Sequence, residues 1–261
     1  MKQYQGFFID LDGTVYRGKD KIPAAARFVR RLQQNQRQIL FVTNNSTRSP
    51  QEVAENLRVN HDIDVTSANV YTSAMATADY LDQHAGQKRR VYAIGERGLK
   101  DALLNKGMKL TDQSPDYVVV GLDRNVTYEQ FKIATLAIRA GATFIGTNGD
   151  TNLPSEEGMI PSAGALVELV RYATQQEPIM IGKPQKTIIE MALKASGLKK
   201  SEVLMVGDNY QTDVKAGINT GVDTLLVYTG LSKPADIKQE KIKPTYTVDT
   251  LDEWIIENTN N

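Results

Sequence analysis

Residues 7–14 of the chain read FFIDLDGT, a short apolar run that ends in two aspartates. Because residues i and i+2 share one face of an extended strand, Asp10 and Asp12 are expected to project together around Leu11. Gly13 then permits the sharp turn that ends the strand. Two carboxylates this close repel one another unless a cation compensates their charge. The pattern suits a reaction in which one carboxylate is the nucleophile and the other transfers a proton. The alternative without a catalytic role is a pair of solvent-exposed aspartates.

The rest of the chain alternates short apolar runs with amphipathic stretches, which favours an α/β fold around a parallel sheet. Strands are expected at residues 7–9, 39–42, 70–72, 91–94, 117–120, 143–145, 179–181, 203–206 and 224–228. Helices are expected at residues 24–34, 51–58, 73–82, 97–105, 128–139, 163–174, 186–195 and 213–219. A polar stretch at 84–90 and a linker at 175–178 bracket the middle of the chain. We therefore expect one α/β domain that is interrupted by a second.

The amino-acid composition argues against several classes of binding and catalytic site. The 261 residues include 31 Lys and Arg against 31 Asp and Glu, and this balance argues against a general nucleic-acid binder. With no Cys and only two His, the chain is not expected to carry disulfides, a thiolate zinc site, a Cys nucleophile or a His-based triad. No apolar run approaches the ~18 residues of a membrane span, and no signal peptide is visible. A cytoplasmic protein without nucleic-acid or membrane partners is the expectation.

A second motif lies at residues 39–47, where the apolar run ILFV leads into TNNST. A hydroxyl, amides and free backbone N–H groups at the end of a strand can bind an oxyanion. Thr43 and Asn44 are the candidates for this role. The alternative is a turn whose Asn and Ser side chains form only local hydrogen bonds.

Two further motifs also follow apolar runs. In IMIGKP at 179–184, the Lys183 ammonium could neutralise a phosphate or a nucleophilic carboxylate, although most lysines are solvated surface groups. In VLMVGDNYQTD at 203–213, Asp208 lies directly outside the strand end and Asp213 could reach back toward it. The alternative for such an aspartate is a helix cap.

All four motifs lie at the carboxyl ends of expected strands, the edge where open parallel sheets bind ligands. Their acidic members would form an all-oxygen cluster that suits Mg²⁺ rather than a soft metal. This acidic set comprises Asp10, Asp12, Asp208 and Asp213. Thr43, Asn44 and Lys183 would supply the donors and the positive charge that a transferring phosphoryl group needs.

Four short motifs thus occur in a fixed order: DLDGT, TNN, GKP and GDNYQTD. They resemble the four motifs of the haloacid dehalogenase (HAD) superfamily. Over essentially its whole length the chain resembles the NagD-like, p-nitrophenylphosphatase-like branch, including the stretches YTSAMATADYL, GTNGD and PSAGAL. The resemblance implies a Rossmann-like HAD core with a parallel sheet at residues 1–86 and 180–261. It also implies an α/β cap domain at residues 87–179, inserted between the second and third motifs.

The resemblance also implies roles for the acidic residues. Asp10 would be the nucleophile and form an aspartyl-phosphate. Asp12 would protonate the leaving alcohol and then deprotonate the water that hydrolyses this intermediate. Mg²⁺ would be held by Asp10, Asp208 and the backbone oxygen of Asp12, with Asp213 as a supporting group outside the direct ligands.

The remaining motif residues would bind the phosphoryl group. The resemblance implies that Thr43 and the Asn44 N–H bind its oxygens, and that Lys183 neutralises its charge. Asn209, which follows the expected metal ligand Asp208, could touch metal-bound water or substrate.

The activity implied is Mg²⁺-dependent hydrolysis of small phosphate monoesters, such as a sugar phosphate, a nucleotide or p-nitrophenyl phosphate. The expected partner is therefore a small-molecule phosphate ester, and a homo-oligomer is compatible with the sequence. The alternative is a non-enzymatic module, either a receiver-like protein phosphorylated on Asp or a protein that only binds a phosphate ligand. A receiver carries its phosphorylated Asp alone on a later strand, and a silent binder would be expected to lack Asp10 or Asp12. The sequence therefore favours the enzyme.

Overall fold

The computed structural model describes residues 2–256, which form two compact units. The first unit comprises the residues up to Thr43, residues 51–71 and the residues from Lys183 onward, and the second comprises Asn44–Pro50 and Thr72–Gly182. The chain therefore passes between the units four times, at the borders of these segments. The assignment of a core to residues 1–86 and 180–261 and of a cap to residues 87–179 stays a prediction.

The first unit is built on a six-stranded sheet. In sheet order its strands are β15 (Tyr246–Val248), β14 (Asp223–Val227), β13 (Val203–Gly207), β1 (Gly6–Ile9), β4 (Gln38–Thr43) and β5 (Val70–Thr72). The strands from β15 to β4 pair in parallel. Strands β4 and β5 lie on one side of β1 in the sheet, and β13, β14 and β15 lie on the other side. This change of side at β1 is the place where open parallel sheets bind ligands at their carboxyl ends.

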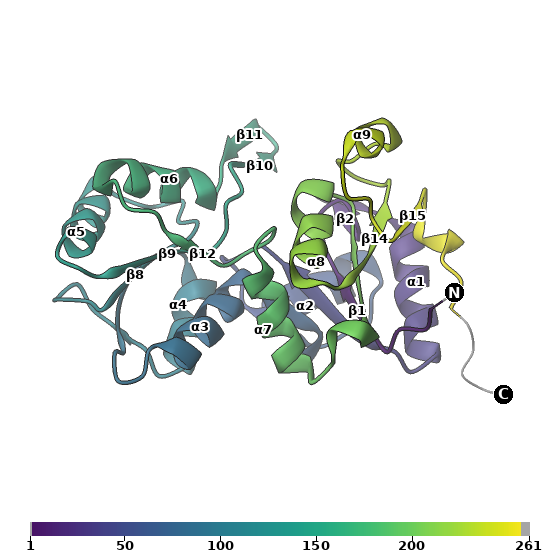
Figure 1. Cartoon of the computed structure of the whole chain (residues 1–261), viewed down its shortest axis with the longest axis horizontal. Helices are drawn as coiled ribbons and strands as arrows, with labels where there is room; N and C mark the ends of the chain where they lie inside the picture. The colour runs from purple at the N-terminus through teal and green to yellow at the C-terminus, as the bar shows by residue number, and fades with distance from the viewer. Residues whose placement is uncertain (1, 257–261) are drawn as a thin grey trace. The chain divides into compact units, whose positions relative to one another are not determined.

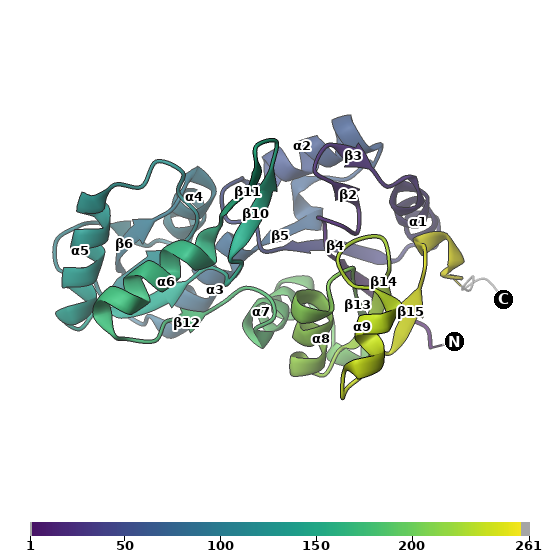
Figure 2. The same ribbon diagram turned by 90° about the horizontal axis from the view of Figure 1, so that it is seen from above.

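Helices cover both faces of this sheet: Figure 2 shows α1 and α2 on one side and α7 and α8 on the other. The helices of this unit are α1 (Pro23–Gln34), α2 (Pro50–His61), α7 (Lys186–Ser196), α8 (Lys215–Thr220) and α9 (Pro234–Gln239). Short helical turns are η1 (Ser67–Asn69), η2 (Lys200–Glu202), η3 (Tyr210–Val214) and η4 (Leu251–Glu253). A small antiparallel hairpin of β2 (Tyr16–Arg17) and β3 (Asp20–Lys21) follows β1.

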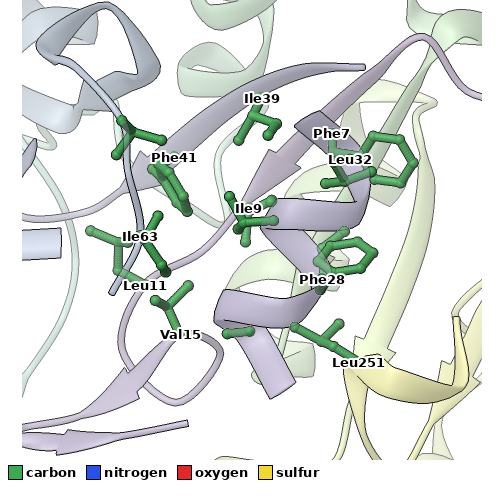
Figure 3. Close-up of a cluster of buried hydrophobic side chains, with 14 of the residues drawn as sticks. Phe7, Ile9, Leu11, Val15, Phe28, Leu32, Ile39, Phe41, Ile63 and Leu251 are labelled. Carbon is green, nitrogen blue, oxygen red and sulfur yellow. The ribbon is translucent and has the colours of Figure 1, made fainter. Parts of the chain in front are cut away.

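An apolar core fixes β1 against α1 (Figure 3). Phe28 and Leu32, four residues apart on α1, lie on one face of the helix and are fully buried with Phe7 and Ile9 of β1. The rings of Phe7 and Phe28 meet edge to face, with centroids 5.8 Å apart. Because both neighbours of β1 in the sheet are also buried, the strand is a rigid support for the residues that follow Ile9.

The second unit has a five-stranded parallel sheet of its own. In sheet order its strands are β12 (Ile179–Met180), β9 (Thr143–Gly146), β8 (Tyr117–Val120), β6 (Arg90–Ile94) and β7 (Lys109–Leu110). Its helices are α3 (Ser73–His84), α4 (Arg97–Asn105), α5 (Tyr128–Arg139) and α6 (Ala163–Thr174). Figure 1 shows α5 and α6 on one side of this sheet and α3 and α4 on the other. The antiparallel strands β10 (Asn152–Ser155) and β11 (Gly158–Pro161) form a hairpin.

One expected strand belongs to a different sheet from the one predicted. The apolar run at 179–181 was expected to resume the first domain, but it forms β12, which pairs with β9 of the second sheet through Ile179–Ile145 and Met180–Gly146. A three-residue apolar run indicates a strand without specifying its neighbour, and backbone pairing decides that choice. The chain returns to the first unit only at Lys183.

Other differences concern the ends of elements. The helix expected at 213–219 is divided between the π-helical turn η3 and the short helix α8, while α2 and α3 continue to His61 and His84. The sequence patterns missed β7, β15, α9 and the hairpin strands, each of which is two to six residues long. Among residues 2–256, no helix is long and apolar enough to cross a bilayer.

Candidate active site

A buried lysine joins two aspartates at the carboxyl edge of the first sheet. Lys183 Nζ donates hydrogen bonds to Asp10 Oδ1 and, over 2.8 Å, to Asp213 Oδ1. It also donates to the carbonyl oxygen of Val42, at 2.9 Å. The Lys183 side chain is only 2% exposed. Since an ammonium has three N–H donors and these three acceptors converge on it, the position of the charge is fixed.

Two local features bring the aspartates to this lysine. Asp10 follows β1 directly, and its N–H donates to the carbonyl oxygen of Val206 in β13 at 2.9 Å. The backbone hydrogen bonding between β1 and β13 therefore extends to Asp10. Asp213 returns to the strand end because η3 is a single tight turn, in which the Asn209 N–H donates to Asp213 Oδ2 at 3.1 Å. Gly207 permits the return, since a Cβ at this position would lie 2.3 Å from the Cβ of Asp213.

Asp208, immediately after β13, is held by neutral donors. Thr14 Oγ1 donates to Asp208 Oδ1 at 3.2 Å, and the Leu231 N–H donates to Asp208 Oδ2 at 2.8 Å. The carbonyl oxygen of Asp208 accepts from the Ser232 N–H at 3.1 Å. The side chain is buried, so these contacts replace the hydration that the carboxylate loses on folding.

Three buried carboxylates lie close together, and the Lys183 ammonium is the cation paired with two of them. Ligand oxygens of Asp10, Asp208 and Asp213 all lie within 4.8 Å of one another. Burial and the charge of Asp213 raise the pKa of Asp10 well above its usual 3.8, against the opposing attraction of Lys183. The same two causes raise the pKa of Asp208 to about 6. Burial alone would lower the pKa of Lys183, but attraction to Asp10 and Asp213 outweighs it and raises that pKa.

This charge balance fits a bound metal ion. One ammonium would not neutralise three ionised carboxylates, so full ionisation would leave excess negative charge in a place where water is largely excluded. A divalent cation would offset the repulsion that raises the pKa values of Asp10 and Asp208. The donors are oxygens only, which hard cations prefer over soft ones.

Two other expected site residues lie at the same strand ends. Asp12 is exposed, and it forms an isolated bridge with Tyr16. Its side chain is not part of the close carboxylate group formed by Asp10, Asp208 and Asp213. Thr43 is the last residue of β4 and is buried.

Asn44 and Asn209 make hydrogen bonds that the sequence did not indicate. The Asn44 carboxamide donates through Nδ2 to Asp150 Oδ1 at 3.0 Å and to Asp150 Oδ2 at 3.2 Å, within the second unit. The main-chain carbonyl oxygen of Asn44 accepts from Ser73 Oγ at 2.6 Å. Asn209 Oδ1 accepts from the Gln211 N–H at 2.9 Å and so caps η3.

Sequence reasoning missed one segment that contacts the carboxylate group. The loop after β14 supplies the Leu231 and Ser232 N–H donors to Asp208. Its sequence, YTGLS at 228–232, follows an expected strand and contains small polar residues, the same signal that marked the other four motifs. The hydrogen bond between Asn44 and Asp150 was missed as well, because nothing in the GTNGD stretch indicates which residue Asp150 contacts.

Two family models match the chain: "Haloacid dehalogenase-like hydrolase" over residues 7–109 and "HAD-hydrolase-like" over residues 180–254. The 5'-nucleotidase YutF of Bacillus subtilis is 48% identical over 258 residues, which cover 98% of this chain and 99% of the relative. The chain belongs to the haloacid dehalogenase superfamily. An acid sugar phosphatase of Staphylococcus epidermidis is 49% identical to this HAD protein over 259 residues, with the same coverage.

Solved structures place the HAD protein in one branch of the superfamily. A single-mutant thermostable NPPase from Geobacillus stearothermophilus superposes with a TM-score of 0.92 at 47% identity, over 98% of this chain and 100% of that chain. NagD from Escherichia coli K-12 gives the same TM-score and coverage at 30% identity. The prediction of a NagD-like, p-nitrophenylphosphatase-like member with an α/β core and cap is therefore confirmed.

The HAD protein is a phosphatase, a hydrolase of phosphate monoesters. This confirms the prediction of an enzyme over that of a non-enzymatic receiver-like or phosphate-binding module. The buried group of Asp10, Asp208 and Asp213 is typical of the metal site of HAD proteins.

Proposed function

We propose that this phosphatase hydrolyses small phosphate monoesters in a Mg²⁺-dependent reaction that passes through an aspartyl-phosphate on Asp10. The observation that carries the proposal is the buried ion pair between Lys183 and Asp10, next to Asp208 and Asp213. It holds one carboxylate oxygen of Asp10 in a fixed direction, which is what a nucleophile needs for in-line attack on phosphorus.

The reaction divides into two displacements. An Asp10 oxygen attacks the phosphorus, the bond from phosphorus to the ester oxygen breaks, and the Asp12 carboxyl gives its proton to the leaving alkoxide. Asp12 then removes a proton from water, which attacks the phosphorus and releases inorganic phosphate and the free Asp10 carboxylate. The exposed position of Asp12 supports this role, because the group that moves the protons has to reach both the ester oxygen and water.

The charges around Asp10 support the same assignment. Lys183 compensates the negative charge that gathers near Asp10, and Asp213 holds Lys183 in place from the other side. The carboxylates of Asp10 and Asp208 and the backbone oxygen of Asp12 would hold Mg²⁺, with Asp213 outside the direct ligands. When bound, the ion supplies positive charge to the phosphoryl oxygens.

Donors near the end of β4 complete the proposal. Thr43 and the backbone N–H of Asn44 would bind the phosphoryl oxygens, and Asn209 would contact the substrate beside Asp208. The Asn44–Asp150 hydrogen bond supports this role for Asn44, since it fixes the orientation of the residue that follows Thr43.

The substrate class follows from the relatives. They are called a 5'-nucleotidase, an acid sugar phosphatase and a p-nitrophenylphosphatase, and these names differ in the alcohol that the phosphate ester carries. We therefore propose nucleotides, sugar phosphates and p-nitrophenyl phosphate as the substrates to compare. A cytoplasmic location and assembly into homo-oligomers stay predictions.

A phosphate-release assay tests the proposal. The full chain is incubated with p-nitrophenyl phosphate, nucleoside monophosphates and sugar phosphates, with Mg²⁺ or with EDTA. We expect Asp10→Asn to abolish release with its unfolding transition retained, because the amide keeps the size of the side chain and loses the nucleophile. The matched control is Asp101→Asn, which changes an exposed carboxylate on α4 and should keep wild-type activity. Retained turnover in Asp10→Asn would refute the mechanism.

A further inference from the structure

The loop after β14 binds two parts of the first unit that are far apart in the sequence. We call residues Thr229–Ser232 the strap. Thr229 Oγ1 donates to the carbonyl oxygen of Gly13 at 2.7 Å. The carbonyl oxygen of Thr229 in turn accepts from Arg17 of the β2–β3 hairpin, with Nε at 2.6 Å. Thr229 therefore fastens the strap to the loop that carries Asp10 and Asp12.

The next residues of the strap enclose the carboxylate of Asp208. The Leu231 N–H donates to Asp208 Oδ2 at 2.8 Å, and the Ser232 N–H donates to the Asp208 carbonyl oxygen at 3.1 Å. Ser232 Oγ accepts from the Tyr210 N–H at 2.8 Å, which ties the strap to η3. The main chain and the side chain of Asp208 are thus both held by the strap.

Gly230 makes this enclosure possible. A Cβ at position 230 would lie 1.8 Å from Asp208 Oδ2, so any side chain here would displace the carboxylate. Its φ is not in the left-handed region, so the backbone does not require glycine at this position. The close approach to Asp208 is what requires it.

The hydrogen bonds to Asp208 leave room for a further ligand. Oδ1 accepts from Thr14 Oγ1 and Oδ2 accepts from the Leu231 N–H. A carboxylate offers about four lone-pair positions, so two neutral hydrogen bonds fix its rotation and leave acceptor capacity on both oxygens. Groups that orient a metal ligand in this way typically change metal affinity by ~10–100-fold when they are removed.

We propose that Thr229 is a positioning residue for the metal site. Its hydroxyl anchors the strap to Gly13, and the strap then fixes the rotation of the Asp208 carboxylate for cation binding. The inference rests on the proposed function, in which Asp208 is a metal ligand. Thr229 itself touches neither the substrate nor the reacting atoms in this scheme.

The test measures Mn²⁺ binding to the full chain from the electron paramagnetic resonance signal of free Mn²⁺. We expect Thr229→Val to weaken Mn²⁺ binding by ~10-fold or more and Thr229→Ser, which keeps the hydroxyl, to restore it. The apparent Mg²⁺ requirement for activity should rise in Thr229→Val, while kcat at saturating Mg²⁺ changes much less. Wild-type Mn²⁺ affinity in Thr229→Val would overturn the proposal.

Thr220→Val is the matched control. Thr220 is buried whereas Thr229 is partly buried, but it likewise donates its hydroxyl to a main-chain carbonyl oxygen, that of Ala216 at 2.7 Å, within α8. It should bind Mn²⁺ as the wild type does. An equal loss of affinity in Thr220→Val would show that Thr229 acts through general packing and would also overturn the proposal.

Two more variants keep the outcome interpretable. Gly230→Ala should weaken Mn²⁺ binding by displacing the carboxylate, and it tests the strap if Thr229→Val does not fold. Asp208→Asn should abolish Mn²⁺ binding. If Asp208→Asn binds Mn²⁺ normally, the metal assignment of the proposed function fails. If it loses binding while Thr229→Val and Gly230→Ala do not, only the role of the strap fails.

Discussion

Lys183 donates to Asp213 over 2.8 Å in a pair whose two side chains are each 2% exposed. The same ammonium also contacts Asp10, so one cation serves two buried carboxylates while a third, Asp208, lies beside them. Removing one member of a buried ionic group leaves the others without compensation, which costs more than losing an exposed pair. The stability of the first unit should therefore depend on Lys183.

Replacing this lysine gives the first prediction. In metal-free buffer at neutral pH, Lys183→Met should lower the free energy of unfolding by about 3 kcal/mol, because Asp10 and Asp213 lose their counter-charge. The deficit should shrink as the pH falls, since burial raises the pKa of Asp10 and a protonated Asp10 needs no counter-charge. Urea unfolding at several pH values measures both effects.

The control for that variant is Lys186→Met. Lys186 pairs with Glu190 at 3.3 Å, but its side chain is 61% exposed. Exposed pairs contribute little, so we expect a change within about 0.5 kcal/mol at every pH. If the two variants lost equal amounts of unfolding free energy, burial would not increase the contribution of the Lys183 charge to stability, and the prediction would be wrong.

A second prediction concerns proton transfer by Asp12. Asp12→Asn should lower the steady-state rate by ~100-fold or more, because both displacements lose their acid or base. Rapid quenching followed by intact-protein mass spectrometry shows which step is slower. Accumulated phosphoprotein indicates that hydrolysis limits the variant, and unmodified protein indicates that phosphoryl transfer to Asp10 does. A variant with the wild-type rate would exclude Asp12 as the proton-transfer group.

Metal removal gives a third prediction. EDTA should abolish phosphate release and added Mg²⁺ should restore it. Because the ion binds only the folded protein, Mg²⁺ at ~100 times its dissociation constant should add about 2.7 kcal/mol to the free energy of unfolding. Asp208→Asn should show no such increase at matched ionic strength. Activity that is indifferent to EDTA would contradict the metal role.

A fourth prediction is a pH effect from His61 of α2. Its ring is buried and stacks on Tyr16 with centroids 4.5 Å apart, and its Nδ1 has no hydrogen-bond partner. Burial lowers the pKa of His61 below its usual 6.5; the charge of Lys21 adds to this and that of Asp62 opposes it. The folded state thus binds this proton less readily than the unfolded state. The contribution of neutral His61 to the free energy of unfolding is complete above pH 6.5. It is lost as the pH falls from 6.5 toward the lowered pKa of the folded state.

Matched aromatic variants isolate this effect. His61→Phe keeps the stack on Tyr16 and cannot be protonated, so its urea midpoint should fall less than that of the wild type between neutral and mildly acidic pH. His84 also stacks on a tyrosine, Tyr80, with centroids 4.2 Å apart, but it is exposed. His84→Phe should follow the wild-type pH profile. Parallel profiles for wild type and His61→Phe would contradict the prediction.

Much of the site could be predicted from the sequence because its residues follow apolar strands. Asp10 and Asp208 lie directly after β1 and β13, and a parallel sheet brings the ends of adjacent strands together. Asp213 is five residues beyond Asp208, close enough for one tight turn to return it. The ion pair with Lys183 was harder to predict from the sequence, because the lysine follows a strand of the other sheet.

Contacts between distant segments were beyond the sequence pattern. Thr229 and Gly13 are 216 positions apart, and only the folded chain shows that the hydroxyl of one meets the carbonyl of the other. Gly230 looks like an ordinary turn glycine until the nearby carboxylate of Asp208 is seen. Strand β15 was missed because it has only three residues, of which Tyr246 and Val248 are partly buried and Thr247 is exposed, so it lacks the long apolar run of an interior strand.

The four places where the chain leaves one unit for the other affect how this enzyme can be re-engineered. Exchanging the second unit for that of another phosphatase requires joints after Thr43, Pro50, Tyr71 and Gly182 rather than a single pair of cuts. The first and last joints adjoin Thr43 and Lys183 themselves. A graft chosen to alter substrate preference therefore has to preserve the backbone at both residues, or it will also change the chemistry it was meant to leave alone.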